Sequence, residues 1–294
     1  KAYVAGALGP TNKTLSISPD VSNPAFRGAD FDEVAQTYFE QAEALINGGA
    51  DLLMPETIFD TLNAKASIYA IRQLEEKLGQ RIPVIISVTV SDKSGRTLSG
   101  QTLEAFYTSI RHADPLAVGM NCALGGEEMR PLIREMARLV PRFLSCYPNA
   151  GLPNPLSATG YDQTPEDFAH TLKEMAEEGL LNLAGGCCGT TPEFIEALRD
   201  QLKGAPARRP PKPESTLQLS GLEPLKFPSK ERETFFMVGE RTNVAGSPKF
   251  AKFVKDEDWT SCLEVARQQV RSGANLIDIN FDEAMLDGVK SMRH

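Results

Sequence analysis

The chain has 294 residues, and 31 lysines and arginines against 39 aspartates and glutamates give it a net charge of −8 at neutral pH. It lacks the basic excess that binding to a phosphate backbone requires, and no apolar run approaches the roughly 20 residues of a membrane helix. The hydrophobic share of 41% is that of a globular protein, not of a collagen-like or disordered chain. We therefore expect neither a nucleic acid nor a membrane as a partner.

Cysteine usage indicates the compartment. The five cysteines are an odd number and two of them are adjacent, Cys187 and Cys188, which makes a poor framework of secreted disulfides. The first residues also lack the apolar core and cleavage site of a secretory signal. We expect a cytoplasmic protein. Because position 1 is a lysine and the sequence opens directly on a strand-like run, we also expect a piece of a longer polypeptide.

The first two thirds of the chain alternate short apolar runs with longer amphipathic ones. Residues 31–50 have apolar side chains every three or four positions, which predicts a helix. Thr164-Pro165 and Thr191-Pro192 are typical helix starts, with a capping hydroxyl before a first-turn proline. Glycines at 48, 49 and 179 are placed to end helices. The predicted strands are residues 3–9, 51–57, 84–90, 116–122, 143–149 and 181–188.

This β-α-β-α rhythm indicates an α/β fold. Strands that are apolar on both faces form parallel sheets covered by helices. Six βα units without a dinucleotide-binding glycine fingerprint favour a (β/α)8 TIM barrel that lacks its first two strands over an open doubly wound sheet. A complete barrel needs about 250 residues, so the first block is expected to be a barrel truncated at its start.

The alternation of predicted strands and helices stops after Lys203 and resumes near Phe235. The stretch between is rich in proline and charge, which is typical of a linker. A strand and loop at 235–243, a helix from about 256 to 272 and a strand at 275–282 then predict the first βα units of a second TIM barrel. We expect three parts: a barrel at 1–204, a linker at 205–235 and the start of a second barrel at 236–294.

Three of the cysteines follow predicted strands. Cys122 ends one strand, and Cys187 and Cys188 end another. Catalytic groups of barrel enzymes lie at this end of the strands, so the three thiols are expected to converge. Adjacent residues in a straight strand point to opposite faces, so the pair can share a ligand only if the chain bends, which the flanking glycines permit. Three thiolates suit a zinc ion with one position left open, as in catalytic zinc sites.

Other interpretations stay open on these residues alone. Cysteine is a common small core residue, and the adjacent pair can form a vicinal disulfide. A closed structural zinc site or a redox module with a disulfide would be a function of another class. A fourth sulfur ligand would support it, and only Cys146 or Cys262 is left to provide one. Composition does not decide between these and a catalytic site.

Several motifs carry a family resemblance. MNCALG (120–125), CYPNAGLPN (146–154) and GGCCGTTPEFI (185–195) resemble the zinc-dependent homocysteine methyltransferases. The same motifs followed by SGLEPL (220–225), VGERTNVAGS (238–247) and DINFDEAMLD (278–287) resemble the family of cobalamin-dependent methionine synthases. GGCCG identifies only the homocysteine barrel. GERTN after SGLEPL indicates a second barrel, which binds methyltetrahydrofolate.

The resemblance implies roles for residues in the first barrel. Its zinc ligands match Cys122, Cys187 and Cys188, which would activate the thiol of homocysteine. Asn149 matches a residue that can approach the metal when substrate is absent, and Glu56 matches the acid that binds the substrate amino group. The family's glycine-rich DGG-type motif, whose backbone holds the substrate carboxylate, does not occur in these residues.

In the second barrel the resemblance implies a pterin site. Its contacts match Glu240 and Asn243, with Asp278, Asn280 and Asp282 as further candidates. A carboxylate and an amide can pair with the donor and acceptor edge of a pterin ring.

The implied cofactors are zinc and cobalamin, with methyltetrahydrofolate as the methyl donor. In the family, zinc-bound homocysteine thiolate takes the methyl group of methylcobalamin, and methyltetrahydrofolate restores it. The cobalamin domain is expected elsewhere in the same polypeptide, since no corrinoid-binding DxHxxG-type run occurs here. The nearest alternative is a homocysteine methyltransferase that uses betaine or S-methylmethionine, and GERTN and the linker argue against it.

Overall fold

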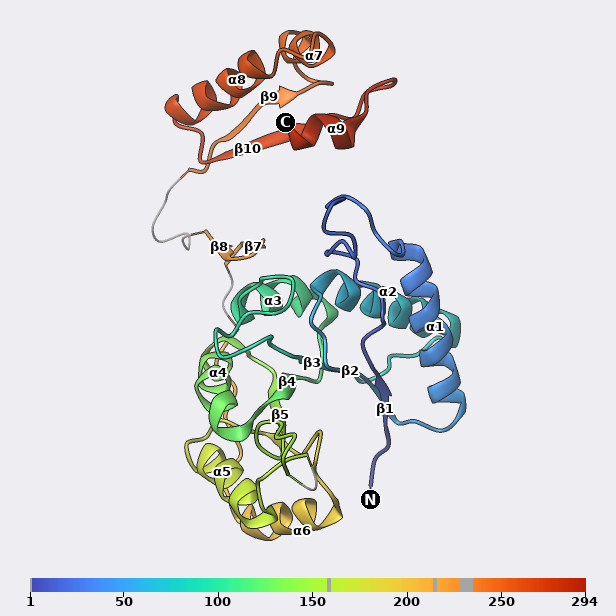
Figure 1. Ribbon diagram of the computed structural model, residues 1–294, viewed down its shortest axis with the longest axis vertical. Coiled ribbons are helices and arrows are strands. Elements are labelled where there is room, and N and C mark those ends of the chain that lie inside the picture. The colour runs from blue at the N-terminus through green and yellow to red at the C-terminus, as the bar shows by residue number, and fades with distance from the viewer. Residues whose placement is uncertain (1, 158–159, 214–215, 228–234) are drawn as a thin grey trace. The chain divides into compact units, whose positions relative to one another are not determined.

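The computed structural model describes residues 2–157, 160–213, 216–227 and 235–294. The chain forms two compact units, residues 1–227 and 228–294, and each is described by itself (Figure 1).

The first six strands of the first unit run parallel and follow one another in chain order. β1 pairs with β2, and β3 to β6 form a four-stranded sheet. A parallel bridge between Leu53 and Val84 joins the two groups. The strands are β1 (Ala5–Leu8), β2 (Leu52–Pro55), β3 (Ile85–Val88), β4 (Ala117–Gly125), β5 (Phe143–Asn149) and β6 (Leu183–Ala184). The predicted α/β class with parallel strands is confirmed.

Helices separate successive strands and lie outside them (Figure 1). Parallel neighbours need such crossover connections. One buried cluster lies around β3, β4 and β5 and includes Phe106, Met120 and Phe168, and another lies under α1 and α2. The helices are α1 (Phe31–Asn47), α2 (Thr61–Leu78), α3 (Leu103–Ile110), α4 (Gly126–Leu139), α5 (Pro165–Glu177) and α6 (Pro192–Gln201), with a 3-10 turn at Arg111–Ala113.

The two predicted Thr-Pro helix starts differ in detail. Both helices begin at the proline. Thr164 Oγ1 accepts a hydrogen bond from the Asp167 backbone N–H at 3.2 Å, as a capping residue does. Thr191 makes no side-chain cap bond, and its hydroxyl donates to the carboxylate of Glu193. The prediction of a capping hydroxyl is therefore confirmed for α5 and wrong for α6.

The last predicted strand of the first unit is shorter than expected. Residues 181–188 were expected to be extended, whereas β6 covers only Leu183–Ala184. Beyond it the chain passes through Gly185 and Gly186 and turns at Gly189, where φ is +79°. Cys187 and Cys188 therefore lie on the loop after β6 and not in the strand.

The first part of the predicted linker packs on the first unit. Arg208 is only 4% exposed, and its guanidinium donates hydrogen bonds to backbone carbonyls of Ala137, Val140 and Arg142. Farther along, an antiparallel hairpin of β7 (Gln218–Ser220) and β8 (Pro224–Lys226) lies against α3, where Ser220 Oγ donates to the Ala105 carbonyl at 2.6 Å. Residues 214–215 and 228–234 of this segment lie outside the described residues.

The second unit has two parallel strands, β9 (Val238–Asn243) and β10 (Leu276–Asn280), joined through two helices. The helix expected from 256 to 272 begins later, as α8 (Trp259–Arg271), because Asp258 caps it through the Ser261 N–H. An unexpected helix, α7 (Pro248–Lys255), precedes it, and α9 (Gly288–Arg293) follows β10. Among the described residues of the chain, no helix is both long and apolar enough to cross a membrane.

Candidate functional site

Cys122 lies on a distortion of β4. Asn121 pairs with Tyr147 of β5 but the next paired residue is Gly125, so the residues between them bulge out of the ladder. Cys122 and Ala123 both have φ of +62°, a region that non-glycine residues rarely adopt. Such bulges redirect side chains and are frequent beside active sites. Here the bulge turns the Cys122 sulfur out of the alternating pattern of the strand.

Cys187 and Cys188 lie on the loop after β6, which is tied to β5. The Cys187 N–H donates to the Pro148 carbonyl at 2.8 Å, and the Ala150 N–H donates to the Cys188 carbonyl at 2.9 Å. These backbone bonds fix both residues beside the end of β5. The bend that the glycines permit is thus present, and it lets two successive side chains point the same way.

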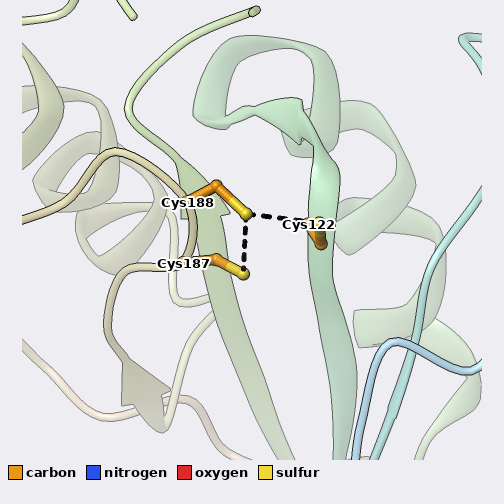
Figure 2. A group of neighbouring side chains, drawn as sticks. All are labelled: Cys122, Cys187 and Cys188. Carbon is orange, nitrogen blue, oxygen red and sulfur yellow. Dashed lines mark hydrogen bonds between the residues drawn. The ribbon is translucent and has the colours of Figure 1, made fainter. Parts of the chain in front are cut away.

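The three sulfurs converge (Figure 2). Cys188 Sγ lies 3.8 Å from Cys122 Sγ and 3.9 Å from Cys187 Sγ, and all three atoms are within 4.8 Å of one another. In a tetrahedral zinc site with bonds of about 2.3 Å the sulfurs lie about 3.8 Å apart. A disulfide needs about 2.05 Å, so no pair is at bonding distance. The spacing fits a metal ion held by three sulfurs.

Neither remaining cysteine completes this cluster. Cys146, on β5, is fully buried and its sulfur contacts Met129 Sδ at 3.9 Å. Burial raises the pKa of the Cys146 thiol to about 12, so it stays protonated. Cys262 is in the core of the second unit. Within the described residues, the only group with metal-ligand spacing is Cys122, Cys187 and Cys188.

The cluster stabilises negative charge on sulfur. The pKa of Cys122 is lowered to about 5, chiefly because the Cys187 thiol donates a hydrogen bond to it and also because the Ala123 N–H does so. The same shared proton raises the pKa of Cys187. The hydrogen bonds within the cluster thus favour the thiolate form of Cys122, and thiolates are the form of cysteine that binds metal.

Glu56 lies one residue beyond β2, near Cys122. Its carboxyl is partly buried, and burial raises its pKa, with the nearby Cys122 charge adding to the shift and the Tyr147 hydroxyl opposing it. Tyr147 Oη is itself buried, and it lies close to the Glu56 carboxyl and to Ser87. A carboxyl and a phenol hydroxyl therefore lie next to the sulfurs, and both are groups that can bind a small polar molecule.

Asn149 lies at the end of β5 and is 2% exposed. Its Oδ1 accepts a hydrogen bond from the Cys188 N–H at 3.1 Å, and its side chain also approaches the Cys122 sulfur closely enough to lower the pKa of that thiol. The structure thus brings together all five site residues that the sequence predicts for the first barrel: Glu56, Cys122, Asn149, Cys187 and Cys188.

Two further groups at this site were not identified from the sequence. Asn121 is completely buried and its Nδ2 lies 3.8 Å from Cys187 Sγ. The ring of Tyr161 packs on Gly189, and its hydroxyl faces Cys188. The position of Asn121 directly before Cys122 was the feature of the sequence from which its role could have been inferred. Tyr161 is on a long loop, where sequence spacing carries little information on position.

The polar candidates of the second unit lie near the ends of β9 and β10. Asn243 Nδ2 donates to Asp278 Oδ2 at 3.2 Å, and Asn243 Oδ1 accepts from the Ala245 and Gly246 N–H groups. Asn280 Oδ1 accepts from the Asp282 N–H at 2.6 Å. Glu240 is exposed and pairs with Arg241 at 3.4 Å. Asn243 and Asp278 are therefore in contact, whereas Asn280 and Asp282 form a local turn.

Two family models match the chain. Residues 1–202 match the model of homocysteine S-methyltransferase, and residues 239–294 match that of pterin binding enzymes. The two matches fall on the two structural units in the order that the sequence motifs predict. Together they fit a methionine synthase-like arrangement.

Solved structures of one enzyme are also similar. The apo form of the homocysteine methyltransferase MmuM from Escherichia coli is 24% identical, with a TM-score of 0.50 over 68% of this chain and 62% of that one. Its metallated form is 26% identical over 59% of this chain and 52% of that one, with a TM-score of 0.45. The chain thus spans less than two thirds of the length of either. The first match supports a TIM-barrel-like fold.

Proposed function

Since the chain belongs to the homocysteine S-methyltransferase family, we propose that it takes part in making methionine from homocysteine, with methyltetrahydrofolate as donor and cobalamin as carrier. This is the reaction of a cobalamin-dependent methionine synthase. The methyl group leaves N5 of the folate and ends on the homocysteine sulfur; the thiol gives up its proton, and N5 takes one up, so that tetrahydrofolate is formed.

One observation carries the proposal. Three sulfurs from β4 and the loop after β6 are spaced for a tetrahedral metal, and within the described residues no histidine, aspartate, glutamate or further cysteine joins them. A site with three protein ligands and one open position is the arrangement of catalytic zinc. The open position would accept the homocysteine sulfur.

The residues around the cluster have separate parts in this proposal. Cys122, Cys187 and Cys188 would hold zinc, which supplies a positive centre at which the substrate thiol loses its proton at neutral pH. Glu56, whose carboxyl lies near the cluster, would receive the ammonium group of homocysteine. Asn149, which is bonded to the Cys188 backbone, would keep the loop in place as substrate enters.

The methyl donor is inferred from the second unit. A pterin-binding segment after the homocysteine segment favours methyltetrahydrofolate over betaine or S-methylmethionine. Glu240, Asn243 and Asp278 would contact the pterin, with Asn280 and Asp282 at the same strand end. We infer that cobalamin is bound by a further domain of the same polypeptide.

X-ray absorption at the zinc edge tests the central step. With zinc bound to the chain, we expect three sulfur ligands without homocysteine and four with it. A closed structural site would show four sulfurs, or no change, in both states. A redox module would bind no stoichiometric zinc and would form a disulfide under mild oxidation. Either result would contradict the proposal.

A further inference from the structure

Asn121 is an unusual residue for the end of a buried strand. Its side chain is completely buried, directly before Cys122. Its Oδ1 accepts hydrogen bonds from the Ser87 hydroxyl at 2.7 Å and from the Thr57 N–H at 3.0 Å. Its Nδ2 donates to Thr57 Oγ1 at 2.7 Å and approaches Cys187 Sγ at 3.8 Å. All four hydrogen-bonding positions of the amide are thus directed at named partners.

Thr57 is the strained member of this network. Its φ is +56°, which is an outlier for a β-branched residue. Such conformations persist only where surrounding contacts hold them, and they concentrate at functional sites. Asn121 contacts both the N–H and the hydroxyl of Thr57. Because Glu56 directly precedes Thr57, the hydrogen bonds from Asn121 to Thr57 also fix the backbone position of Glu56.

The other end of the amide reaches the sulfur cluster. Cys187 is on a loop, whereas Asn121 is on the most extensively paired strand of the first unit. A hydrogen bond from Nδ2 to the Cys187 sulfur therefore joins the loop that carries this sulfur to the buried strand β4. Hydrogen bonds to a metal-bound ligand fix its orientation and tune its charge. The planar amide sets the direction of this bond, because Oδ1 is already held by Ser87 and Thr57.

We propose that Asn121 is a positioning residue that joins the Cys187 metal ligand to the Glu56 side of the site. It holds the Cys187 sulfur at metal-binding distance from Cys122 and Cys188, and through Thr57 it keeps the carboxyl of Glu56 at a fixed separation from the metal. The inference rests on the proposed function, since it requires that Cys187 bind zinc.

Two substitutions in the 294-residue chain test it. Asn121→Asp keeps the size and the oxygen that faces Ser87 and Thr57 but removes both amide N–H donors, one to the Cys187 sulfur and one to the Thr57 hydroxyl. We expect its zinc affinity to fall by about 10- to 100-fold, as for other residues that support metal ligands. With Co²⁺ in place of zinc, its sulfur-to-metal charge-transfer band should shift. Ser87→Ala is the matched control, because it removes a bond to Oδ1 and leaves Nδ2 in place, so affinity and band should stay as in the parent.

Folding must be separated from positioning. If folded Asn121→Asp binds zinc like the parent and has an unchanged cobalt spectrum, or if Ser87→Ala changes both equally, Asn121 has only a structural part and the inference is wrong. If Asn121→Asp does not fold, the unsubstituted chain loaded with ¹¹³Cd decides. A scalar coupling between cadmium and the Asn121 amide protons supports the hydrogen bond, and its absence overturns it.

Failure of the proposed function gives a different result. If the chain with Asn121 intact binds no stoichiometric zinc, or if Cys187→Ala binds it fully, the metal site itself is wrong. A normal zinc site that is insensitive to Asn121→Asp refutes only the inference about Asn121.

Discussion

The two units differ in how firmly the surrounding structure holds their candidate site residues. In the first unit, β4 is buried along almost its whole length, and Cys187 and Cys188 on the adjoining loop are held by backbone hydrogen bonds. In the second unit, one residue of β9 and none of β10 is buried, and five apolar residues form the buried cluster beside them. Asn243 and Asp278 contact each other there, but Glu240 extends to solvent.

The sulfur cluster of the first unit is therefore preorganised, whereas the candidate pterin contacts of the second unit are only partly arranged. A binding constellation needs its side chains fixed by packing and by supporting hydrogen bonds. The sulfur cluster has both, because Asn121 and Asn149 lie behind it and both are buried. We therefore expect substitutions in the first unit to act sharply on metal binding, and substitutions in the second unit to act by smaller, graded losses.

The largest effect is expected for Cys187→Ala. Removing one of three sulfur ligands leaves too few groups to retain zinc, so stoichiometric zinc should be lost. Metal analysis of the purified chain measures this. Cys146→Ala is the control, because that sulfur faces Met129 in the core, and full zinc is expected. Full zinc in Cys187→Ala would show that the cluster is not the metal site.

The next largest effect concerns the boundary of the first unit. Arg208→Ala removes a buried guanidinium that bonds to three backbone carbonyls, so those carbonyls lose their charged donor. We expect the free energy of unfolding to fall by about 3 kcal/mol. Arg209→Ala is the matched control, because Arg209 is exposed, and its effect should stay within about 0.5 kcal/mol. Denaturant titration distinguishes them. Equal effects would mean that residues near 208 act as a free linker.

A graded effect is expected for Asn243→Ala. Losing a hydrogen-bond partner that a bound pterin would cover costs about 1 to 3 kcal/mol, so methyltetrahydrofolate should bind roughly five- to 150-fold more weakly. In a polypeptide that also carries the cobalamin domain, methyl transfer from preformed methylcobalamin to homocysteine should be almost unchanged.

Asn275→Ala provides the control for that substitution. Asn275 also bonds through its side chain to a backbone N–H, that of Met237, but it lies at the opposite end of the same strand pair. We expect folate binding to be retained in this variant. Equal loss in both variants, or loss of both half-reactions in Asn243→Ala, would mean that Asn243 supports the fold.

The sequence predicted the strands and the sulfur cluster for a common physical reason. Buried parallel strands require long apolar runs, and the ends of such strands meet at one edge, so Cys122 could be related to the distant Cys187 and Cys188. The two glycines before the pair also indicated a bend, which the chain makes earlier than expected, after Ala184.

Other features depend on contacts that no local pattern encodes. The left-handed Cys122 and Thr57 are maintained by the bulge of β4 and by Asn121, both of which arise only after the strands pair. Arg208 is in a proline-rich stretch, where composition predicts a linker, yet its guanidinium finds three carbonyls of residues near the end of α4. Such tertiary partners override the local signal.

The smallest effect compares two identical motifs. Thr164-Pro165-Glu166 and Thr191-Pro192-Glu193 read alike, but only Thr164 caps its helix. Thr164→Ala exposes the Asp167 N–H and should lower the free energy of unfolding by about 1 kcal/mol. Thr191→Ala loses only an exposed bond to Glu193, so we expect a change below about 0.5 kcal/mol. Urea titrations of both variants give the comparison. An equal loss would mean that Thr191 caps α6 in solution, and that the difference between the two threonines does not persist there.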